Sequence, residues 1–452
     1  MTSLRFLKFL ILLCGFQMIA PVSAVIHIQE IKSPGGLKAW FVEDKTTPVI
    51  SLSFAFKVGS TADPIGKEGV AELTAEMLME GAGEFDTQAF SGKLQDLAIG
   101  IGYSASLDFF TGSMTTLRAN YQEAVRMLNL TLTQPRLDPE ALKRVKDQHL
   151  TYLKNVAHNP GYLANLKIMK ELYPDHPYHR ETPGTSQTIP NIKSEDIKHY
   201  LTNYLSQDKL VIGIAGNLTA QEAGDLLDKA FKGLSATGQS VEVPNIRTNK
   251  RAQTIVLKKD IPQSTVVFAH HGVTFEDPEV LKVTVLMQIL GAGDISRLNE
   301  EIREKRGLAY SVGAGLLTMK HGGLVMGSLG TENDCVKESI ALVQAEWKRM
   351  HDHGVTHKEF NNAKTYLVGS FPLRFTNSAA ISASLLQLQY SGKDKNYINE
   401  RNPLIDAITL EQINEVAKWL LKPDSLVFVV VGKPVGLDNG SKKSIREARL
   451  EE

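Results

Sequence analysis

The feature of this sequence that most constrains its fold is an internal repeat. Residues 189–197 and 405–413 share the spacing of their isoleucines and of one glutamate, and residues 208–216 and 424–432 both end an apolar run with glycine. Both pairs are offset by the same 216 residues, from 189 to 405 and from 216 to 432. Each copy predicts an amphipathic helix followed by a buried strand. A chance resemblance between two α+β domains would not keep this order and offset, so we expect two related domains.

The two halves also match nearer to their starts. Residues 102–104 (Gly-Tyr-Ser) and 309–311 (Ala-Tyr-Ser) each begin a stretch that predicts two strands joined by a hairpin. Long helical patterns follow at 121–132 and at 335–351. In the first half, the Asp-Pro-Glu sequence at 138–140 predicts a further helix, with the aspartate as N-cap and the proline at the first helical position.

The repeat leads to a prediction of the domain organisation. Polar sequence around residues 233–253, with glycine, serine and a basic run, separates the two copies. We therefore expect an α+β fold of two homologous domains, each a mainly antiparallel sheet covered by helices. The predicted boundaries are a signal peptide at 1–24, an N-terminal domain at 25–232, a linker at 233–253, a C-terminal domain at 254–436 and a polar tail at 437–452.

The composition excludes several classes of protein. The 452 residues include 50 basic and 50 acidic side chains, with 42% hydrophobic and 22% charged residues, which is typical of a folded globular chain. A net charge of zero argues against a nucleic-acid binder that relies on bulk basic charge. The chain has two cysteines, one of them in the predicted signal peptide, so a framework of disulfides is excluded.

The first 24 residues have the pattern of a secretory signal peptide. Arg5 and Lys8 precede an apolar run at residues 9–19, and small residues at 21–24 supply a cleavage point. The run is shorter than the roughly 20 residues of a membrane span. A lipoprotein signal ending at Cys14 is an alternative, although bulky leucine precedes that cysteine. We expect the mature chain to be exported, in a periplasm, with no membrane span.

Three segments resemble one family, the pitrilysin/insulinase-type zinc peptidases, whose signature is an inverted H-x-x-E-H motif. Residues 58–77 look like the family's metal-binding helix and the Gly-Ser that precedes it. Residues 172–185 are similar to its Tyr-Pro-x-His-Pro-Tyr loop, and residues 289–310 are close to its Ser-Arg-Leu and Arg-Glu-Lys-x-Gly-Leu-Ala-Tyr segment. The resemblance covers nearly all of the mature chain and implies a peptidase-like clamshell half, because members are built from such paired domains.

The sequence departs from the family at the residues that carry the chemistry. Glu72 and Glu76 stand where the motif has its two histidines, and Ala75 stands where it has the general base. The distal zinc-binding glutamate aligns approximately with Tyr152, although Gln148 and His149 are nearby. None of the four roles is filled, so the resemblance implies a degenerate zinc motif.

The chemistry of the donors agrees with this interpretation. Glu72 and Glu76 share one helix face at a spacing of four residues. Catalytic zinc prefers imidazole or mixed ligands and an open position for water, which two carboxylates do not supply. Ala75 cannot accept a proton from water. A weak site for a hard cation is the functional alternative. We expect this chain to bind no metal and no cofactor.

The other half of the family's active site is present. The motif's arginine and tyrosine fall on Arg303 and Tyr310, and Gly307 is a plausible C-cap that places them in the last helical turn and on the next strand. In isolation, Arg303 could equally be a surface charge and Tyr310 a core residue. The resemblance implies that this pair holds the substrate backbone and stabilises the oxyanion.

Three functions follow from these observations. The first is a non-catalytic subunit of a heterodimeric zinc metallopeptidase, in which a homologous partner binds zinc and this chain supplies Arg303 and Tyr310 in trans to a peptide substrate. The second is a peptide-binding or scaffolding protein with no role in proteolysis. The third is a self-sufficient metallopeptidase with unusual ligands. In all three, we expect no nucleic-acid partner.

Overall fold

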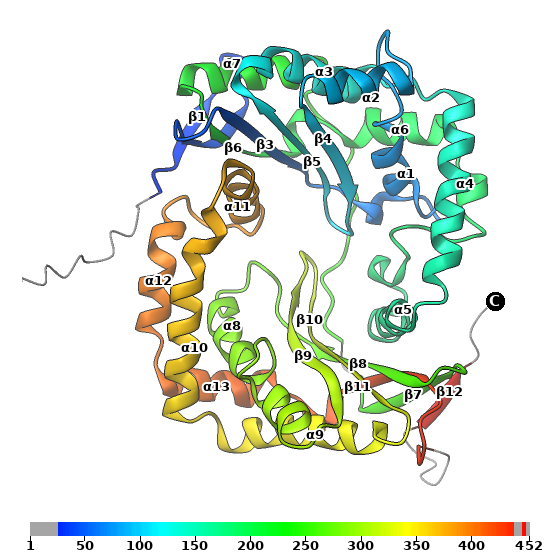
Figure 1. Ribbon diagram of the computed structural model, residues 1–452, viewed down its shortest axis with the longest axis vertical. Helices are drawn as coiled ribbons and strands as arrows, with labels where there is room; N and C mark the ends of the chain where they lie inside the picture. Colours follow the sequence, from blue (N-terminus) through cyan, green and yellow to red (C-terminus); the bar gives the residue numbers. More distant parts are fainter. Residues whose placement is uncertain (1–25, 249, 438–444, 449–452) are drawn as a thin grey trace, which may run out of the picture.

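The structure is a computed structural model that describes residues 26–248 and 250–437, together with the backbone of 445–448. The predicted signal peptide and Cys14 lie outside the described residues. Two six-stranded sheets form the frame of the molecule, and their inner sides are turned toward each other (Figure 1). None of the helices that the structure describes is long and apolar enough to cross a membrane.

The first sheet has the strand order β1-β2-β6-β3-β5-β4. Its β2–β6 pair is parallel and its other pairs are antiparallel. On the outer face, Leu52 and Phe54 of β3 pack against helices of the same half and form the main core of that half. The strands are β1 (Gln29–Lys32), β2 (Lys38–Glu43), β3 (Val49–Phe56), β4 (Gly100–Ala105), β5 (Phe110–Leu117) and β6 (Leu210–Gly216).

The second sheet has the strand order β12-β7-β11-β8-β10-β9. The β7–β11 and β7–β12 pairs are parallel, so both sheets are mixed, with antiparallel pairs in the majority. Strand β12 lies within residues 437–452, for which the sequence predicts a polar tail. The strands are β7 (Gln253–Lys258), β8 (Gln263–His271), β9 (Ala309–Thr318), β10 (Gly323–Glu332), β11 (Val427–Gly432) and β12 (Ile445–Ala448).

The helices reproduce the repeat. Helix α6 begins at Ser194 and α13 at Leu410, 216 residues apart, and the strands that follow end at Gly216 and Gly432, as predicted. The first half has α1 (Val70–Met77), α2 (Thr87–Asp96), α3 (Tyr121–Thr133), α4 (Pro139–Val156), α5 (Pro160–Leu172), α6 (Ser194–Tyr204) and α7 (Ala220–Ala230). The second half has α8 (Val280–Leu290), η6 (Asn299–Glu304), α9 (Val336–His353), α10 (His357–Ser370), α11 (Ser378–Tyr390), α12 (Tyr397–Ala407) and α13 (Leu410–Leu420).

The prediction for the start of α4 is confirmed in position, with Asp138 at the N-cap and Pro139 as the first helical residue. However, the Asp138 carboxylate makes no capping hydrogen bond to the helix. It pairs instead with Arg136, whose Nε lies 2.7 Å from Asp138 Oδ2. A neighbouring guanidinium competes successfully for the carboxylate, since charge-assisted hydrogen bonds are stronger than those to neutral amides.

Two helices are exchanged between the halves. Helix α5 of the first half packs against β8 and β11 of the second sheet, and α11 of the second half packs against β3 and β6 of the first sheet (Figure 1). Ala164 and Ile168 of α5 share a buried cluster with Val267 and Val429. Each sheet is therefore covered by helices of its own half on the outside and by one helix of the other half on the inside.

The approach of α11 to the first sheet depends on small residues. A Cβ at Gly213 of β6 would lie 2.4 Å from the Ser382 carbonyl oxygen and 2.9 Å from Leu385 Cβ. Beside this contact, the hydroxyl groups of Ser53 and Ser382 are 2.9 Å apart in a buried hydrogen bond. Glycine at position 213 thus permits the backbone contact between α11 and the sheet.

The turns of two hairpins meet where the halves join. The Asp108 carboxylate, in the β4–β5 turn, accepts a hydrogen bond from the Tyr178 hydroxyl at 2.7 Å and one from the Lys320 N–H, in the β9–β10 turn, at 3.0 Å. The Tyr178 oxygen in turn accepts the His321 N–H at 2.9 Å. This bridge holds one end of the two inner faces together.

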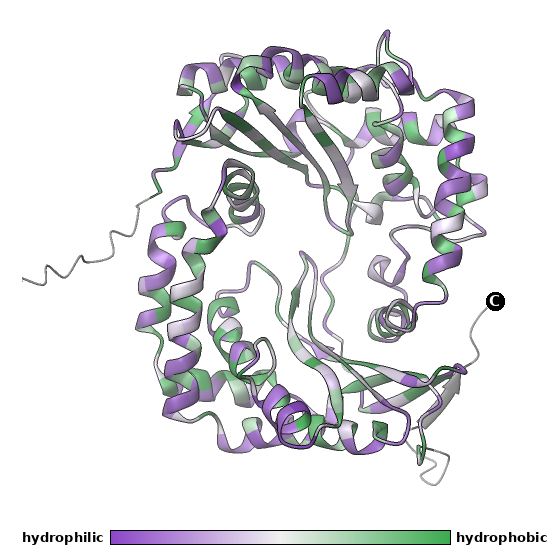
Figure 2. Ribbon diagram, viewed as in Figure 1, coloured by the Kyte–Doolittle hydropathy of each residue, from purple (hydrophilic) through white to green (hydrophobic). Residues whose placement is uncertain are grey.

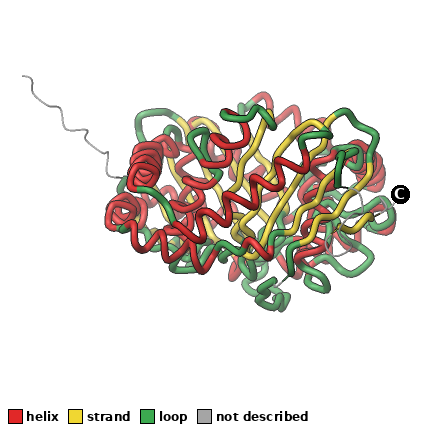
Figure 3. Tube along the Cα trace, turned by 90° about the horizontal axis from the view of Figure 1, so that it is seen from below, coloured by secondary structure: helices red, strands yellow, loops and turns green. Residues whose placement is uncertain are grey.

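The remaining surfaces follow ordinary amphipathic rules. Helix α4 carries hydrophilic residues and hydrophobic residues in alternation along its turns (Figure 2), and its buried residues include Leu142, Val145 and Leu153. Helices also lie across the strands on the outer side of the molecule (Figure 3). On the outer face of the second sheet, Phe268 packs edge-to-face on Trp347 of α9 at 5.5 Å between ring centroids. This arrangement leaves the inner faces as the distinctive surfaces of the fold.

Substitution of Gly213 tests the exchange of helices. We expect Gly213→Ala to lower the free energy of unfolding by about 2 kcal/mol, because the added methyl group overpacks the contact with α11. Gly315→Ala in β9 is the matched control, since a Cβ there would meet no atom within 4 Å. Thermal and denaturant unfolding measure both effects. Equal stability of the two variants would contradict the described contact.

Candidate functional site

The degenerate zinc motif lies on α1, whose start is held by Asp63. The Asp63 carboxylate accepts the backbone N–H groups of Gly69 at 2.8 Å and Ala71 at 2.9 Å. Gly69 has φ of 103°, a left-handed conformation that favours glycine. Burial of the carboxylate raises the pKa of Asp63 to about 7, against the lowering effect of these two hydrogen bonds. The helix is therefore anchored rigidly at the residues that precede the motif.

The two glutamates of the motif lie on one side of α1, while Ala75 is buried. Burial raises the pKa of Glu72, and the nearby charge of Glu76 raises it further. The positive charge of His149 opposes this shift. Helix α1 packs against β4, and Glu76 is directed toward α4.

Glu76 binds a buried histidine that comes from α4. The Nδ1 atom of His149 lies 2.9 Å from Glu76 Oε1, and its Nε2 atom lies 2.7 Å from the Pro183 carbonyl oxygen. Both partners are acceptors, so both ring nitrogens donate, and we assign His149 as the charged imidazolium. Burial by itself would lower the pKa of His149, but the hydrogen bond and the charge of Glu76 raise it overall.

Tyr152 lies one helical turn from this pair. Its ring centroid is 5.8 Å from that of His149, and about half of the residue is exposed. The structure thus brings Glu76, His149 and Tyr152 together. Sequence reasoning named His149 only as a neighbour in an uncertain alignment. The signal that could have identified it is its spacing of three residues from Tyr152 on one face of α4.

These residues do not fit a catalytic zinc site. Zinc needs an imidazole nitrogen with a free lone pair, and both nitrogens of His149 are already engaged. Among the described residues, the one group of three close metal-ligand side chains is Glu332, Asp334 and Cys335, between β10 and α9. Burial and the neighbouring carboxylates raise the pKa of the Cys335 thiol, which disfavours the thiolate that metals bind. A charged histidine occupies the space beside the motif glutamates.

The arginine and tyrosine of the second motif flank a sharp turn. Arg303 lies on η6, which is a π-helix rather than the α-helix that the sequence suggested. Gly307 follows with φ of 61°, and its N–H donates to the Arg303 carbonyl at 3.0 Å, as expected of a glycine that ends a helix. Single-turn π-helices occur often at functional sites.

Tyr310 is the extra residue of a β-bulge. In the β9–β10 ladder Ser311 pairs with Gly330 and Ala309 pairs with Thr331, so Tyr310 has no opposite residue. Its ring lies across Gly330, where an added Cβ would be 2.5 Å from the phenol oxygen. Alternation along β10 from Leu324, which belongs to the inner cluster, places Gly330 on the inner face. Tyr310 is 62% exposed on that face.

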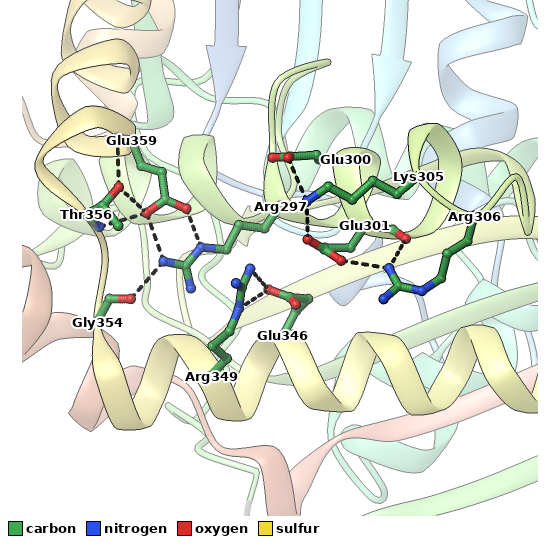
Figure 4. A network of polar contacts seen from close by, with 10 residues as sticks. All are labelled: Arg297, Glu300, Glu301, Lys305, Arg306, Glu346, Arg349, Gly354, Thr356 and Glu359. Carbon is green, nitrogen blue, oxygen red and sulfur yellow. Dashed lines mark hydrogen bonds and ion pairs between the residues drawn. The ribbon is translucent and has the colours of Figure 1, made fainter.

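Arg303 is left unengaged while its neighbours are fixed. Arg297 donates to Glu359 and to the Gly354 carbonyl, and Glu301 accepts from Lys305 and Arg306 (Figure 4). The contacts to Arg297 and to Lys305 and Arg306 outweigh burial and lower the pKa of Glu359 and of Glu301 to about 2. Among the residues that the structure describes, Arg303 has an ion pair only with Glu304, whose Oε1 lies 3.8 Å from its Nε atom, and about half of its side chain is exposed.

The degenerate motif and Tyr310 lie near opposite ends of the β9–β10 hairpin. Helix α1, which carries Glu72, packs against β4, and the β4–β5 turn contacts the β9–β10 turn through Asp108 and Lys320. Tyr310 is at the other end of β9, roughly 26 Å along the strand from Thr318 at about 3.3 Å per residue. The Arg303–Tyr310 pair and the degenerate motif therefore do not form one site within this chain.

The inner faces of the two open hairpins are uncharged. Helices α11 and α5 cover other strands, so β4–β5 and β9–β10 stay accessible from the inside. A cavity of about 610 Å³ lies beside α11 on the first hairpin. Small and hydroxyl side chains line the two faces: Gly102, Ser104, Thr111 and Ser113 on the first, and Ser311, Gly313, Gly315, Ser328 and Gly330 on the second.

The ion pair of His149 and Glu76 predicts a pH-dependent stability. Folding raises the pKa of His149 above its ordinary value of 6.5. The contribution of the ion pair to the free energy of unfolding is therefore complete below pH 6.5 and is lost as the pH rises through the folded-state pKa of His149. We expect Glu76→Gln to cost about 1 kcal/mol near pH 6 and less at alkaline pH, a modest value since Glu76 is partly exposed.

Denaturant unfolding at several pH values measures this difference. Glu242→Gln, in the segment between the halves, is the control and should show no such trend. A cost of Glu76→Gln that does not change with pH would mean that His149 is neutral in the folded protein.

Comparisons with known proteins agree with this geometry. Residues 39–186 match the family described as insulinase (peptidase family M16), and residues 191–367 match the peptidase M16 inactive domain. The Helicobacter pylori protein named "Non-peptidase homolog YmxG" is 30% identical over 94% of this chain and 98% of its own length. A zinc protease of the same organism, PqqE, is 24% identical over 59% of this chain and 61% of its own length.

A solved structure shows the same fold. The crystal structure of a peptidase M16 inactive domain from Pseudomonas fluorescens has a TM-score of 0.85 and 27% identity, and the alignment covers 93% of this chain and all of that one. These relatives carry names that agree with the expectation that the chain is not an active peptidase alone. The chain belongs to the insulinase (M16) peptidase family.

Proposed function

We propose that this protein is an exported, non-catalytic subunit of a heterodimeric zinc metallopeptidase. The proposal rests on one observation: the chain has the arginine and tyrosine of the family's site but not its zinc-binding residues. Tyr310 is exposed on the inner face, and among the described residues Arg303 has only Glu304 at 3.8 Å as a charged partner, whereas an ion pair with His149 occupies the degenerate zinc motif. A chain built in this way can contribute to a peptidase site only when another chain supplies the zinc.

The geometry supports a contribution in trans. The Arg303–Tyr310 pair lies far from the chain's own α1, so it would face the zinc helix of a second molecule. Within Helicobacter pylori, one relative is named a non-peptidase homologue and another a zinc protease. This coexistence supports a pairing of zinc-bearing and zinc-free homologues, with this chain as the zinc-free member.

The two residues would act by holding and polarising the substrate. A guanidinium and a phenol both donate hydrogen bonds, and donors fixed near a peptide carbonyl stabilise the negative charge that develops on its oxygen. The π-helix, Gly307 and the β-bulge fix the backbone on both sides of the pair before substrate binds. Zinc in the partner would supply the activated water.

The inner faces suit an extended peptide. Glycine and small hydroxyl residues on β4–β5 and β9–β10 let a peptide backbone approach closely without charge repulsion. The absence of charged residues at these positions also agrees with the neutral composition, since capture by bulk charge is not available. Peptide selectivity would therefore arise from shape and hydrogen bonding.

Substitutions of the pair test the proposal. In the complex with its H-x-x-E-H partner, we expect Arg303→Ala and Tyr310→Phe to reduce kcat/KM for peptide cleavage by about 100-fold and 10-fold, as for lost oxyanion donors. Arg306→Ala is the matched control, because Arg306 pairs with Glu301 and should leave cleavage unchanged.

Complex formation, followed by size-exclusion chromatography, should be the same for all variants. Unchanged proteolysis by Arg303→Ala and Tyr310→Phe in an intact complex would favour the alternative, a peptide-binding or scaffolding protein with no role in catalysis.

Metal analysis tests the second part of the proposal, that this chain binds no zinc of its own. After exposure to zinc and dialysis, we expect well under one zinc per purified chain, because Glu72 and Glu76 lack a free imidazole partner. One zinc per chain with chelator-sensitive peptide cleavage would instead establish a self-sufficient metallopeptidase.

A further inference from the structure

A cavity of about 690 Å³ lies between α4, α5 and the loop at residues 181–187, outside the site described above. Each helix contributes residues at a spacing of three, four and seven, which places them on one face. These are Leu150, Leu153 and Lys154 on α4 with Ala157 at its C-cap, and Leu163, Leu166, Lys167 and Lys170 on α5. Two helix stripes of leucines and lysines thus face a shared space.

The helix and sheet side of this cavity is lined mainly by leucines, whereas residues 184–187 of the loop line the other side with polar atoms. Leu257 of β7 closes it from the second sheet and, like Leu153, is almost fully buried. Leu150, Leu163 and Leu166 are only half-buried, so part of their surface faces the cavity. Leaving such surface in contact with water costs about 25 cal/mol per Å². The volume is within the range of pockets that enclose a small molecule.

The rim of the cavity is cationic. Three lysines and one glutamate line it, and Lys170 pairs with Glu181 at 3.3 Å while Lys167 pairs with Glu171 at 3.0 Å. Among the described residues, Lys154 makes no hydrogen bond or ion pair. Its ammonium group therefore remains available at the edge of the leucine-lined space.

Tyr162 fixes the opposite side of the rim. Its hydroxyl donates to Glu181 at 3.2 Å, and burial together with the charge of Glu181 raises its pKa, so the phenol stays neutral. Glu181 is thereby satisfied by Tyr162 and Lys170 and does not compete for Lys154. The arrangement combines a wall of leucines, the Glu181 carboxylate held by two donors, and the unpaired ammonium group of Lys154.

We propose that this cavity binds an amphipathic anion with a single acyl chain, such as a free fatty acid. The chain would lie between the leucines of α4 and α5, and the carboxylate would face Lys154. The charge of the rim favours an anion over a neutral apolar molecule, and the volume favours one chain over a two-chain lipid. This site is independent of the peptidase proposal, since it uses neither Arg303 nor Tyr310.

Titration of dodecanoate into the full mature chain, followed by calorimetry, tests this inference. We expect one dodecanoate per chain and about threefold to tenfold weaker binding of dodecanol, which lacks the charge. Leu166→Trp fills the cavity with apolar volume and should weaken dodecanoate binding by at least about tenfold. Lys154→Ala should weaken it by about threefold to tenfold and abolish the preference over dodecanol. Lys198→Ala, at an exposed residue of α6, is the matched control and should bind dodecanoate as the parent chain does.

Three results would overturn the inference. They are the absence of saturable binding, equal binding by Leu166→Trp and the parent chain, and dodecanol binding as tight as that of dodecanoate. Circular dichroism checks that Leu166→Trp is folded. Should that variant not fold, Lys154→Ala decides the matter, because an unchanged preference for dodecanoate over dodecanol in that variant would also contradict the assigned site.

Discussion

The exchange of α5 and α11 between the two halves is the packing contact on which the rest of the structure depends. Each helix covers the inner side of the opposite sheet, with Ile168 buried against Val429 in one half and Ser382 bonded to Ser53 in the other. Because each helix covers only part of its sheet, the hairpins β4–β5 and β9–β10 stay open on the inside. The placement of α5 and α11 therefore both buries the central strands, which stabilises the fold, and leaves the two hairpins exposed.

A histidine side chain lies beside the carboxylates of the degenerate motif. Two carboxylates on one helix face need a cation nearby, since burial and mutual repulsion raise the pKa of Glu72. The imidazolium of His149 supplies that charge and also binds the Pro183 carbonyl, so it links α1, α4 and the following loop. Because both ring nitrogens of His149 are engaged, neither offers the free lone pair that zinc coordination requires.

Much of this arrangement could be predicted from the sequence. The 216-residue offset placed α6, α13 and the strands that follow them, because amphipathic periodicity and terminal glycines are local signals. The exchange of α5 and α11 could not be predicted, because an apolar helix face indicates that the helix is buried but does not indicate which sheet it packs against. The role of His149 depends on a contact across 73 residues, which no local pattern predicts. Nothing in the sequence around Arg303 distinguishes a π-helix from an α-helix.

The central claim is that this chain completes a peptidase site carried by another molecule. Affinity purification of the tagged chain from its native host, with the composition and the chelator-sensitive peptidase activity of the eluate measured together, tests it most directly. The account predicts a one-to-one complex with an H-x-x-E-H homologue that cleaves peptides until zinc is removed. Recovery of the chain alone, or with only copies of itself and no such activity, would contradict it.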